Sequence, residues 1–247
     1  MSLQAVADIV ARGDPDRFDA CMAAPVAARA VLFPIYAFNV EVSRATWAVS
    51  EPMIGEMRLQ WLRDVLDDIA NGKAAGRHEV VAPLADVLDG EGARILDRVV
   101  QARRRDLHSK PFGDVEQFRE YLDETGGGLM WVAARALGGE DETSFRTLGR
   151  VSGLANFLLA VPRLETRVGS PLPDGGSETV RMLARDALAE LRSLRIPRAG
   201  RAASLASWRA GTILRRAAAE PGRVANGTLP ESEFRRRLSL IWAGYSL

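Results

Sequence analysis

The hydrophobic and polar residues of the chain follow the spacing of α-helices along most of its length. In the segment MIGEMRLQWLRDVLDDIANG, residues 53–72, apolar side chains return every three or four positions and so fall on one helical face. The strict alternation of apolar and polar residues that is typical of strands is nearly absent. The pattern predicts an all-α protein.

Capping residues, proline and glycine predict where the helices begin and end. Asp14 and Pro15 start a helix that runs to about Phe33, where Pro34 perturbs its end, and a second helical stretch begins at about residue 35. Asp114, three positions before a glutamine, forms a loose capping box ahead of a helix over 118–139. The other predicted helices cover residues 52–71, two stretches between 78 and 106, 142–160, 177–195, 198–219 and 230–245, the last with Thr228 as N-cap. About ten helices joined by short connections predict a single domain over residues 1–247.

The composition excludes several site chemistries. At 47% hydrophobic residues over 247 positions, the chain can bury a substantial core. Cys21 is the single cysteine, and His78 and His108 are the two histidines. An internal disulfide, a zinc site of cysteine and histidine, and a histidine-based catalytic triad are therefore not expected.

Positive charge is concentrated in the C-terminal quarter of the sequence. The net charge is +1, yet residues 181–247 hold 13 arginines against five acidic residues, a net of +8, so the first 180 residues carry −7. Such a segment can contact anionic lipid or an acidic partner, or can simply form a solvated arginine-rich face. No nucleic-acid partner is expected.

The first residues lack the basic and apolar regions of a signal peptide, and no uninterrupted apolar run approaches 18 residues. We therefore expect a cytoplasmic protein without a membrane span. If the basic segment meets lipid, contact would be peripheral, at the inner face of the membrane.

Three segments, in order, resemble the squalene/phytoene synthase family. RAVLFPIYAFNVEVSRATW (29–47) is similar to the stretch in which Tyr-Ala-Phe precedes the family's first aspartate-rich motif. MRLQWLRDVL (57–66) is similar to its Arg-Leu-x-Trp-Trp-Arg signature, and LGRVSGLANFLLAVPRLETRVGSPLP (148–173) to its second aspartate-rich helix. The likeness covers about residues 15–180 and implies the helical bundle of the isoprenoid synthases, with a central cavity.

The resemblance also says what the family's chemistry requires. Active members join two prenyl diphosphates head to head, and Mg²⁺ held by two carboxylate clusters stabilises the departing pyrophosphate. Counted from the Tyr-Ala-Phe and Leu-Gly landmarks, the family's acidic positions fall on residues without a carboxylate, namely Ser43, Arg44, Trp47, Ala160, Arg163 and Leu164. Arg44 also puts a fixed positive charge where a divalent cation would sit. The resemblance thus implies no catalytic residue, metal site or cofactor of the family type.

By motif position the resemblance implies further residues around the cavity. They are Tyr36, Phe38, Asn39, Glu41, Arg58, Trp61, Gly153 and Asn156, with Trp61 closest to the site. Glu41 is expected on a different helical face from Arg44.

Three other clusters have a functional and a structural interpretation. Asp64, Asp67 and Asp68 share one helical face, and their position after the Arg-Leu-x-Trp segment favours a solvated surface over a metal cluster. The arginines 103–105 are interpreted as a surface group beside an aspartate, not as a phosphate cradle. The glycines 126–128 are interpreted as a point of close helix packing, not as a phosphate loop.

A narrower likeness concerns the branch of the family. YAFNVEVSRATWAVSEPMIGEMRLQW (36–61) is similar to the branch that includes a mitochondrial assembly factor for respiratory complex I. This implies a non-catalytic assembly factor with a membrane-enzyme subunit as client, or a protein that binds an isoprenoid or other lipid without converting it. Two alternatives stay open: a divergent prenyltransferase with relocated ligands for Mg²⁺, and a helical scaffold with a filled core.

Overall fold

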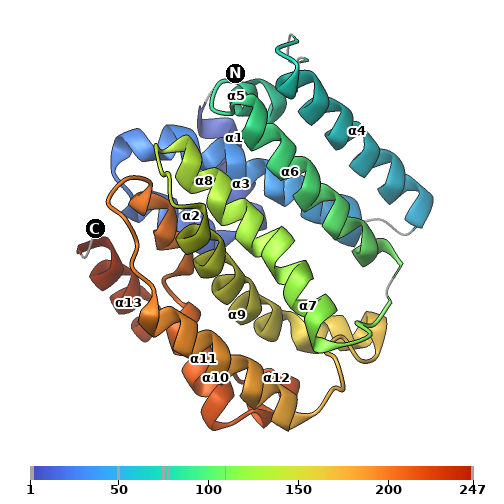
Figure 1. Cartoon of the computed structure of the whole chain (residues 1–247), viewed down its shortest axis with the longest axis vertical. Helices are drawn as coiled ribbons and strands as arrows, with labels where there is room; N and C mark the ends of the chain where they lie inside the picture. Colours follow the sequence, from blue (N-terminus) through green and yellow to red (C-terminus); the bar gives the residue numbers. More distant parts are fainter. Residues whose placement is uncertain (1–2, 49–50, 74–75, 77, 109, 246–247) are drawn as a thin grey trace.

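The computed structural model describes residues 3–48, 51–73, 76, 78–108 and 110–245, and these residues form helices and short connections (Figure 1). The helices are α1 (Leu3–Gly13), α2 (Pro15–Ala23), α3 (Val26–Trp47), α4 (Pro52–Ala70), α5 (Val81–Ala85), α6 (Gly90–Arg103), α7 (Val115–Leu122), α8 (Gly128–Ala136), α9 (Glu142–Val168), α10 (Ser177–Ser193), α11 (Ala210–Ala219), α12 (Gly222–Ala225) and α13 (Glu233–Tyr245). Short 3₁₀ turns η1 (Arg104–Leu107) and η3 (Arg201–Ser207) and a π-helical turn η2 (Asp123–Gly127) interrupt them. No strand occurs in the described part of the chain, which confirms the all-α prediction.

Helix α3 is the buried centre of the N-terminal half. It contacts α1, α2, α4, α6 and α8, and it buries apolar side chains against several of them. By length and composition alone α3 could cross a membrane, yet 61% of its most apolar window is buried inside the protein. Its apolar character is therefore accounted for by the core.

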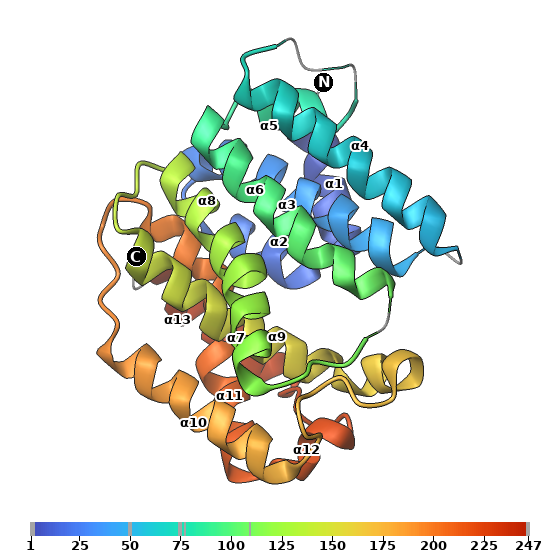
Figure 2. The ribbon, with the colours of Figure 1, turned by 45° about the vertical axis from the view of Figure 1, so that its right-hand side comes forward.

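A second group of buried apolar side chains holds the C-terminal half together. It is formed by α7, α9, α10, α11 and α12 and includes Phe118, Leu158, Ile213 and Leu214. Figure 2 shows α10–α12 at one end of the molecule and α4–α6 at the other, with α9 running between them. The long helix α9 also packs on α8 and η3, so it joins the two groups.

Proline has a different effect on the helices from the one predicted. The first break falls at Ala24 and Pro25, not at Pro34, because the residue before a proline is driven out of the helical region, and Ala24 is extended with φ −74° and ψ 157°. Pro34 lies inside α3, and Pro162 lies inside α9, which continues eight residues beyond the predicted end at Ala160. In both helices burial of the neighbouring turns outweighs the single lost hydrogen bond.

Two terminal helices also differ from the prediction. Helix α1 was not predicted, although Val6, Ile9 and Val10 have helical spacing and are buried. Helix α13 begins at Glu233, not at Pro230. Thr228 is not its N-cap, because the first carbonyl that accepts a helical bond is that of Ser232, from the Arg236 amide at 3.0 Å. The Thr228 amide donates to the Arg223 carbonyl (2.9 Å) and closes the turn after α12.

The glycines 126–128 mark the closest helix crossing. A side chain at Gly126 would approach Gly153 Cα to 3.1 Å, and one at Gly149 would approach Met130 Cβ to 2.6 Å. The backbones of η2 and α9 therefore touch where these glycines face each other, which confirms the close-packing interpretation.

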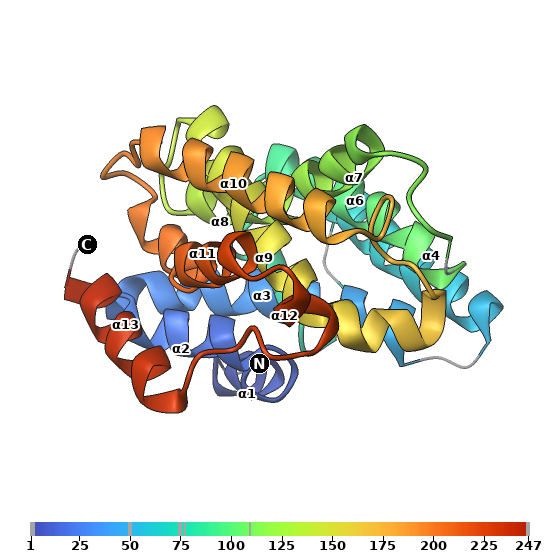
Figure 3. The same ribbon diagram turned by 90° about the horizontal axis from the view of Figure 1, so that it is seen from below.

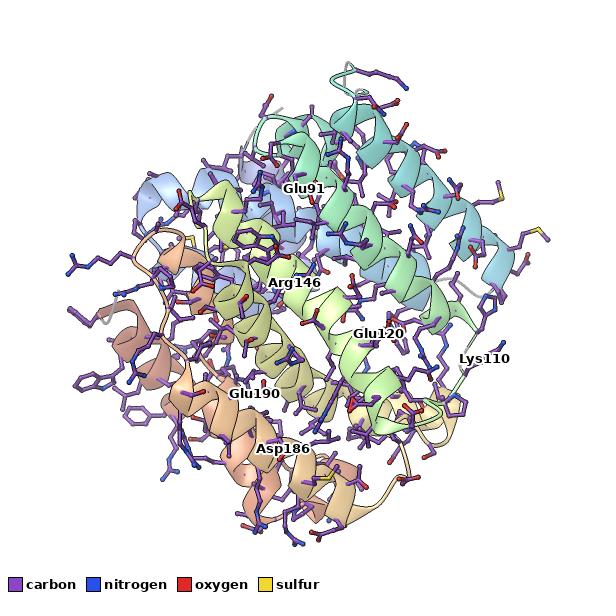
Figure 4. All side chains as sticks on the ribbon, viewed as in Figure 1. Glu91, Lys110, Glu120, Arg146, Asp186 and Glu190 are labelled. Atoms are coloured by element: carbon purple, nitrogen blue, oxygen red, sulfur yellow. The ribbon has the colours of Figure 1, made fainter. Side chains whose placement is uncertain are left out.

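Charged groups hold the π-turn at this crossing in place. From α9, Arg146 and Arg150 donate to the Asp123 carboxylate (3.0 and 3.2 Å), and Arg150 also bonds Glu190 of α10 (2.9 Å). Figure 4 labels Arg146 of α9 and Glu190 of α10. π-Turns inside helices commonly occur at functional sites, and η2 borders the cavity described next.

Candidate functional site

A cavity of about 500 Å³ lies where the two halves of the molecule meet. Its wall is formed by the α1–α2 junction, the C-terminal half of α3, the end of α6, the η2 turn with its neighbours, and α9. The volume is in the range of roughly 300–1,000 Å³ that small-molecule sites occupy.

Most of the residues predicted from the family motifs line this cavity. They are Asn39, Ser43, Arg44 and Trp47 on α3, and Gly153, Asn156, Ala160, Arg163 and Leu164 on α9. On each helix most of them recur at spacings of three or four, with one adjacent pair, so they lie on one side of the helix, and the two sides oppose each other across the space. All six positions that the resemblance aligns with the family's aspartate motifs are therefore brought together at one cavity.

Five predicted residues do not line the cavity, namely Tyr36, Phe38, Glu41, Arg58 and Trp61. Tyr36 and Phe38 are 2% and 1% exposed and lie in the core; Tyr36 is on the same side of α3 as Ser43, with the Arg17 guanidinium 5.5 Å from its ring centroid. Arg58 is exposed and Trp61 is 43% exposed, because α4 packs on α6 through its opposite face. The Trp61 ring contacts His78 (4.9 Å between centroids). Trp61 therefore does not have the position beside the cavity that its motif implied.

Glu41 lies outside the lining but is bonded to a residue of the lining. Its carboxylate accepts from the Arg44 guanidinium at 2.7 Å. The prediction that the two residues occupy different helical faces is wrong, because a separation of three residues places them about 60° apart on a helix. Glu41 thus positions Arg44 from outside the lining.

The described lining is positively charged. Four arginines, Arg17, Arg44, Arg103 and Arg163, contribute to it, against the single carboxylate of Asp14. Asp14 is the N-cap of α2 and binds both the amide (3.1 Å) and the guanidinium of Arg17, so its charge is already neutralised. Arg44 and Arg103 are likewise paired, with Glu41 and Asp106, so Arg163 is the lining arginine without a carboxylate partner among the described residues.

Arg103, Asp106 and Tyr121 form a buried polar cluster that the family motifs did not predict. The Arg103 guanidinium donates to the Tyr121 hydroxyl (2.9 Å) and the Asp106 carboxylate (3.3 Å), and that hydroxyl donates to Asp106 at 3.1 Å. Burial raises the pKa of Tyr121 and also that of Asp106, where Arg103 only partly opposes it. The Nε–H of Arg103 has no hydrogen-bond partner in the described structure.

The neighbouring arginines behave as predicted, whereas Arg103 does not. Arg104 binds Glu56, and Arg105 donates to the Lys110 and Pro111 carbonyls (both 3.2 Å). The surface interpretation is thus right for Arg104 and Arg105, and wrong for Arg103.

The acidic group on α4 is a solvated surface, as predicted: each of its aspartates has its own local partner, Gln60, Asn71 or Lys73.

Apolar residues complete the lining. Val40, Leu122, Leu129 and Phe157 lie beside the charged groups, and Thr125 is buried with its hydroxyl bonded to the Tyr121 carbonyl at 2.6 Å. At the α3 end, Arg167 of α9 stacks on the Trp47 ring (4.8 Å) and donates to the Thr46 carbonyl at 3.2 Å. The lining thus combines guanidinium groups with apolar side chains.

The donor set does not fit the magnesium cluster of the family's catalytic members. Mg²⁺ prefers carboxylate and water oxygens in octahedral geometry, and the described lining offers one carboxylate, held by Arg17, among four cations. Within the described ranges no group of three or more His, Cys, Asp and Glu side chains could hold a metal ion. No chemistry at this site is therefore derived through a metal.

The fold and the cavity define a helical protein of the isoprenoid synthase type, and the sequence assigns it to a family. A profile of the squalene/phytoene synthase family matches residues 10–175, and the chain belongs to this family. The family predicted from three short motifs is confirmed.

Its relatives among characterised proteins are assembly factors. The chain is 24% identical over 170 residues to NADH dehydrogenase (ubiquinone) complex I, assembly factor 6, of Bos taurus and of Homo sapiens; each match covers 63% of this chain and 48% of the relative. The Drosophila melanogaster homolog is 26% identical over 163 residues, with 62% and 49% covered. The chain thus spans about half the length of these relatives, and the predicted branch of the family is confirmed.

Solved structures share the whole fold. A dehydrosqualene synthase determined in complex with ligand superposes with a TM-score of 0.74 at 15% identity, covering 99% of this chain and 95% of that one. A squalene synthase HpnC from Alicyclobacillus acidocaldarius gives a TM-score of 0.62 at 14% identity, with 99% and 92% covered. These likenesses confirm the isoprenoid synthase fold.

Proposed function

We propose that this chain is a non-catalytic member of its family that holds an anionic isoprenoid or similar lipid in the arginine-lined cavity and serves as an assembly factor for a membrane NADH dehydrogenase. The observation that carries the proposal is the set of four arginine guanidinium groups in the lining. Three of them are positioned by Asp14, Glu41 and Asp106, and the fourth, that of Arg163, has no carboxylate partner among the described residues. Arginine binds phosphate oxygens directly and in a planar, bidentate geometry. A phosphorylated headgroup can thus be held without a bridging metal.

The assembly role is supported by the relatives, which are named as assembly factors of complex I. In this proposal the client is a subunit of the membrane enzyme, and the bound lipid stabilises the conformation that the client recognises. The protein would act in the cytoplasm, next to the membrane that receives the complex.

The alternative is a divergent prenyltransferase with relocated ligands for Mg²⁺. It requires at least three carboxylates that converge on one cavity, and Asp14 alone supplies one to the described lining. No observation on the described residues favours this alternative.

Ligand binding is tested by calorimetry with farnesyl diphosphate as the probe, in EDTA and in Mg²⁺. We expect binding in EDTA, no gain from Mg²⁺, and no head-to-head product. The double variant Arg44→Gln/Arg163→Gln should bind at least about 100-fold more weakly, because hydrogen bonds to charged groups contribute about 1.5–3 kcal/mol each. Arg58→Gln, on the exposed face of α4, is the matched control and should bind as the wild type does.

Two results would contradict this part of the proposal: binding that requires Mg²⁺, or turnover of the probe to a head-to-head product. Either result would support the prenyltransferase instead.

The assembly role is tested by deleting the gene in the organism that encodes it. We expect less assembled NADH dehydrogenase on native gels and restoration by the wild-type gene but not by the Arg44→Gln/Arg163→Gln gene. Normal levels of the complex in the deletion strain would refute the assembly role and leave lipid binding to be judged by calorimetry.

A further inference from the structure

Helix α13 presents an uncovered apolar face. Its outward residues are Phe234, Leu238, Ile241, Trp242 and Tyr245, which are 76%, 44%, 55%, 71% and 88% exposed. At 100° per residue these five side chains fall within an arc of about 100°, so they form one continuous stripe. No residue of α13 is buried.

The opposite face of α13 is attached to the protein. Arg236 binds Asp16 (2.9 Å) and also Asp19, both on α2, and a side chain on Gly244 would lie 3.8 Å from Ala23. Figure 3 shows α13 beside α2 at the edge of the molecule. Because these contacts fix the rotation of the helix, the stripe cannot turn inward.

Arginines border the stripe on both sides. Arg235 and Arg237 lie about 100° and 60° from Phe234, one on each flank, and both are exposed. Glu233, the one acidic residue of α13, is already bonded to Arg236 and Arg237 (both 3.0 Å). The outer surface of the helix therefore combines an apolar centre with positive edges.

We propose that α13 is an interfacial helix that lies flat on an anionic lipid bilayer, with the stripe inserted among the lipids and Arg235 and Arg237 at the phosphate level. This goes beyond the proposed function, which concerns the cavity. Helices of this composition lie in the membrane plane, tryptophan and tyrosine favour its interface, and arginine reaches from an apolar surface to charged headgroups.

The same observations argue against a second copy of the chain as the occupant. A helix of 13 residues is about 20 Å long, so its stripe is much smaller than the roughly 800 Å² per partner of a stable dimer. Two such faces would also bring their flanking arginines together. An anionic surface, by contrast, complements both the stripe and its edges.

The proposal is tested by co-sedimentation of the full chain with vesicles of phosphatidylcholine containing 30% phosphatidylglycerol, compared with pure phosphatidylcholine. We expect binding to the anionic vesicles that falls steeply with salt. Phe234→Ser/Trp242→Ser should lower the partition coefficient at least tenfold. Arg235→Gln/Arg237→Gln should lower it about 30-fold, given about 1 kcal/mol per basic residue at an anionic surface.

The matched control is Met53→Ser/Met57→Ser on α4. These methionines are 74% and 68% exposed, so the change removes a similar exposed apolar surface elsewhere, and binding should stay as in the wild type. Circular dichroism should show all variants folded, since every substituted residue is exposed.

Three results would overturn the proposal. One is absence of wild-type binding to the anionic vesicles. Another is equal loss of binding in the stripe variant and the α4 control. The third is a wild-type dimer that the stripe substitutions dissociate without any effect on vesicles, because a second copy would then cover the face.

Discussion

At the scale of single residues, the sign of the charge in the cavity depends on a few side chains on facing helices. Arg44 on α3 and Arg163 on α9 stand where the family resemblance places acidic residues, and both line the cavity. Arg17 and Arg103 add two more guanidinium groups from other elements. Asp14, Glu41 and Asp106 pair with Arg17, Arg44 and Arg103, which leaves the charge of Arg163 in excess. Such a lining attracts phosphate and repels a divalent cation.

A separate residue-scale prediction concerns Cys21, which is fully buried on α2. Burial raises the pKa of its thiol from 9.0 to about 12, so the reactive thiolate is almost absent at pH 8. We expect the native protein to react with Ellman's reagent orders of magnitude more slowly than the protein in urea. Fast labelling of one thiol under native conditions would contradict this burial.

The same pKa gives the sign of a pH effect on stability. Because the thiol pKa is higher in the folded than in the unfolded state, the protonated thiol stabilises the fold below pH 9, and this contribution is lost as the pH rises from 9 towards 12. The variant Cys21→Ala should lack this part of the alkaline loss of stability in urea titrations.

At the scale of the elements, the crossing of η2 and α9 positions one wall of the cavity. Gly126 and Gly149 allow the two backbones to touch, and Gly126 and Gly153 also line the cavity. Their small size therefore sets both the helix separation and the shape of the site.

The substitution Gly149→Ala tests this contact. The added methyl group would lie 2.6 Å from Met130 Cβ and 2.8 Å from the Gly126 carbonyl carbon, so the helices must separate. We expect a loss of about 2–3 kcal/mol in the free energy of unfolding, measured with urea, because overpacking of a tight contact costs about 1–3 kcal/mol. Gly222→Ala has no atom within 4 Å of the new methyl group and should change stability by less than about 0.5 kcal/mol.

At the scale of the whole molecule, an ion-pair cluster joins the two ends of the chain. Arg209, next to α11, binds Asp16 of α2 and Glu231 before α13 (2.9 Å), and Arg236 binds Asp16 as well. The Glu231 side chain is 3% exposed, so its charge depends on Arg209. The cluster holds α13 in the orientation that exposes its apolar stripe.

Replacing Arg209 by methionine tests the cluster. It would leave the Glu231 carboxylate buried without its partner, and we expect a loss of about 3 kcal/mol in the free energy of unfolding. The double variant Arg209→Met/Glu231→Gln should recover part of that loss. Hydrogen exchange should become faster in residues 233–245; unchanged exchange there would argue against the role of the cluster in fixing α13.

Much of the architecture was predictable because helices depend on neighbours in sequence. Asp114 caps α7 as predicted, and its carboxylate accepts from the Gln117 amide at 2.7 Å. Gly72, with a φ of +67°, follows the end of α4. Pro34 and Pro162 lie inside α3 and α9, at or beyond the positions where the predicted helices ended. Burial in the folded chain offsets the cost of a proline inside each helix, and the sequence alone does not show that burial.

The sequence by itself determined the helical class, the family, and the shared faces of α3 and α9, since each follows from residue types at fixed spacing along one helix. Tertiary structure alone decided which residues meet. Arg17, Arg103 and Tyr121 converge from three separate segments, whereas Phe38 and Trp61, selected by motif, lie in the core and at the surface. The exposed stripe of α13 was likewise undecided until its other face was seen to pack on α2. Spacing along a helix fixes the angle between side chains, but the neighbouring elements determine which angle faces a cavity, the core or solvent.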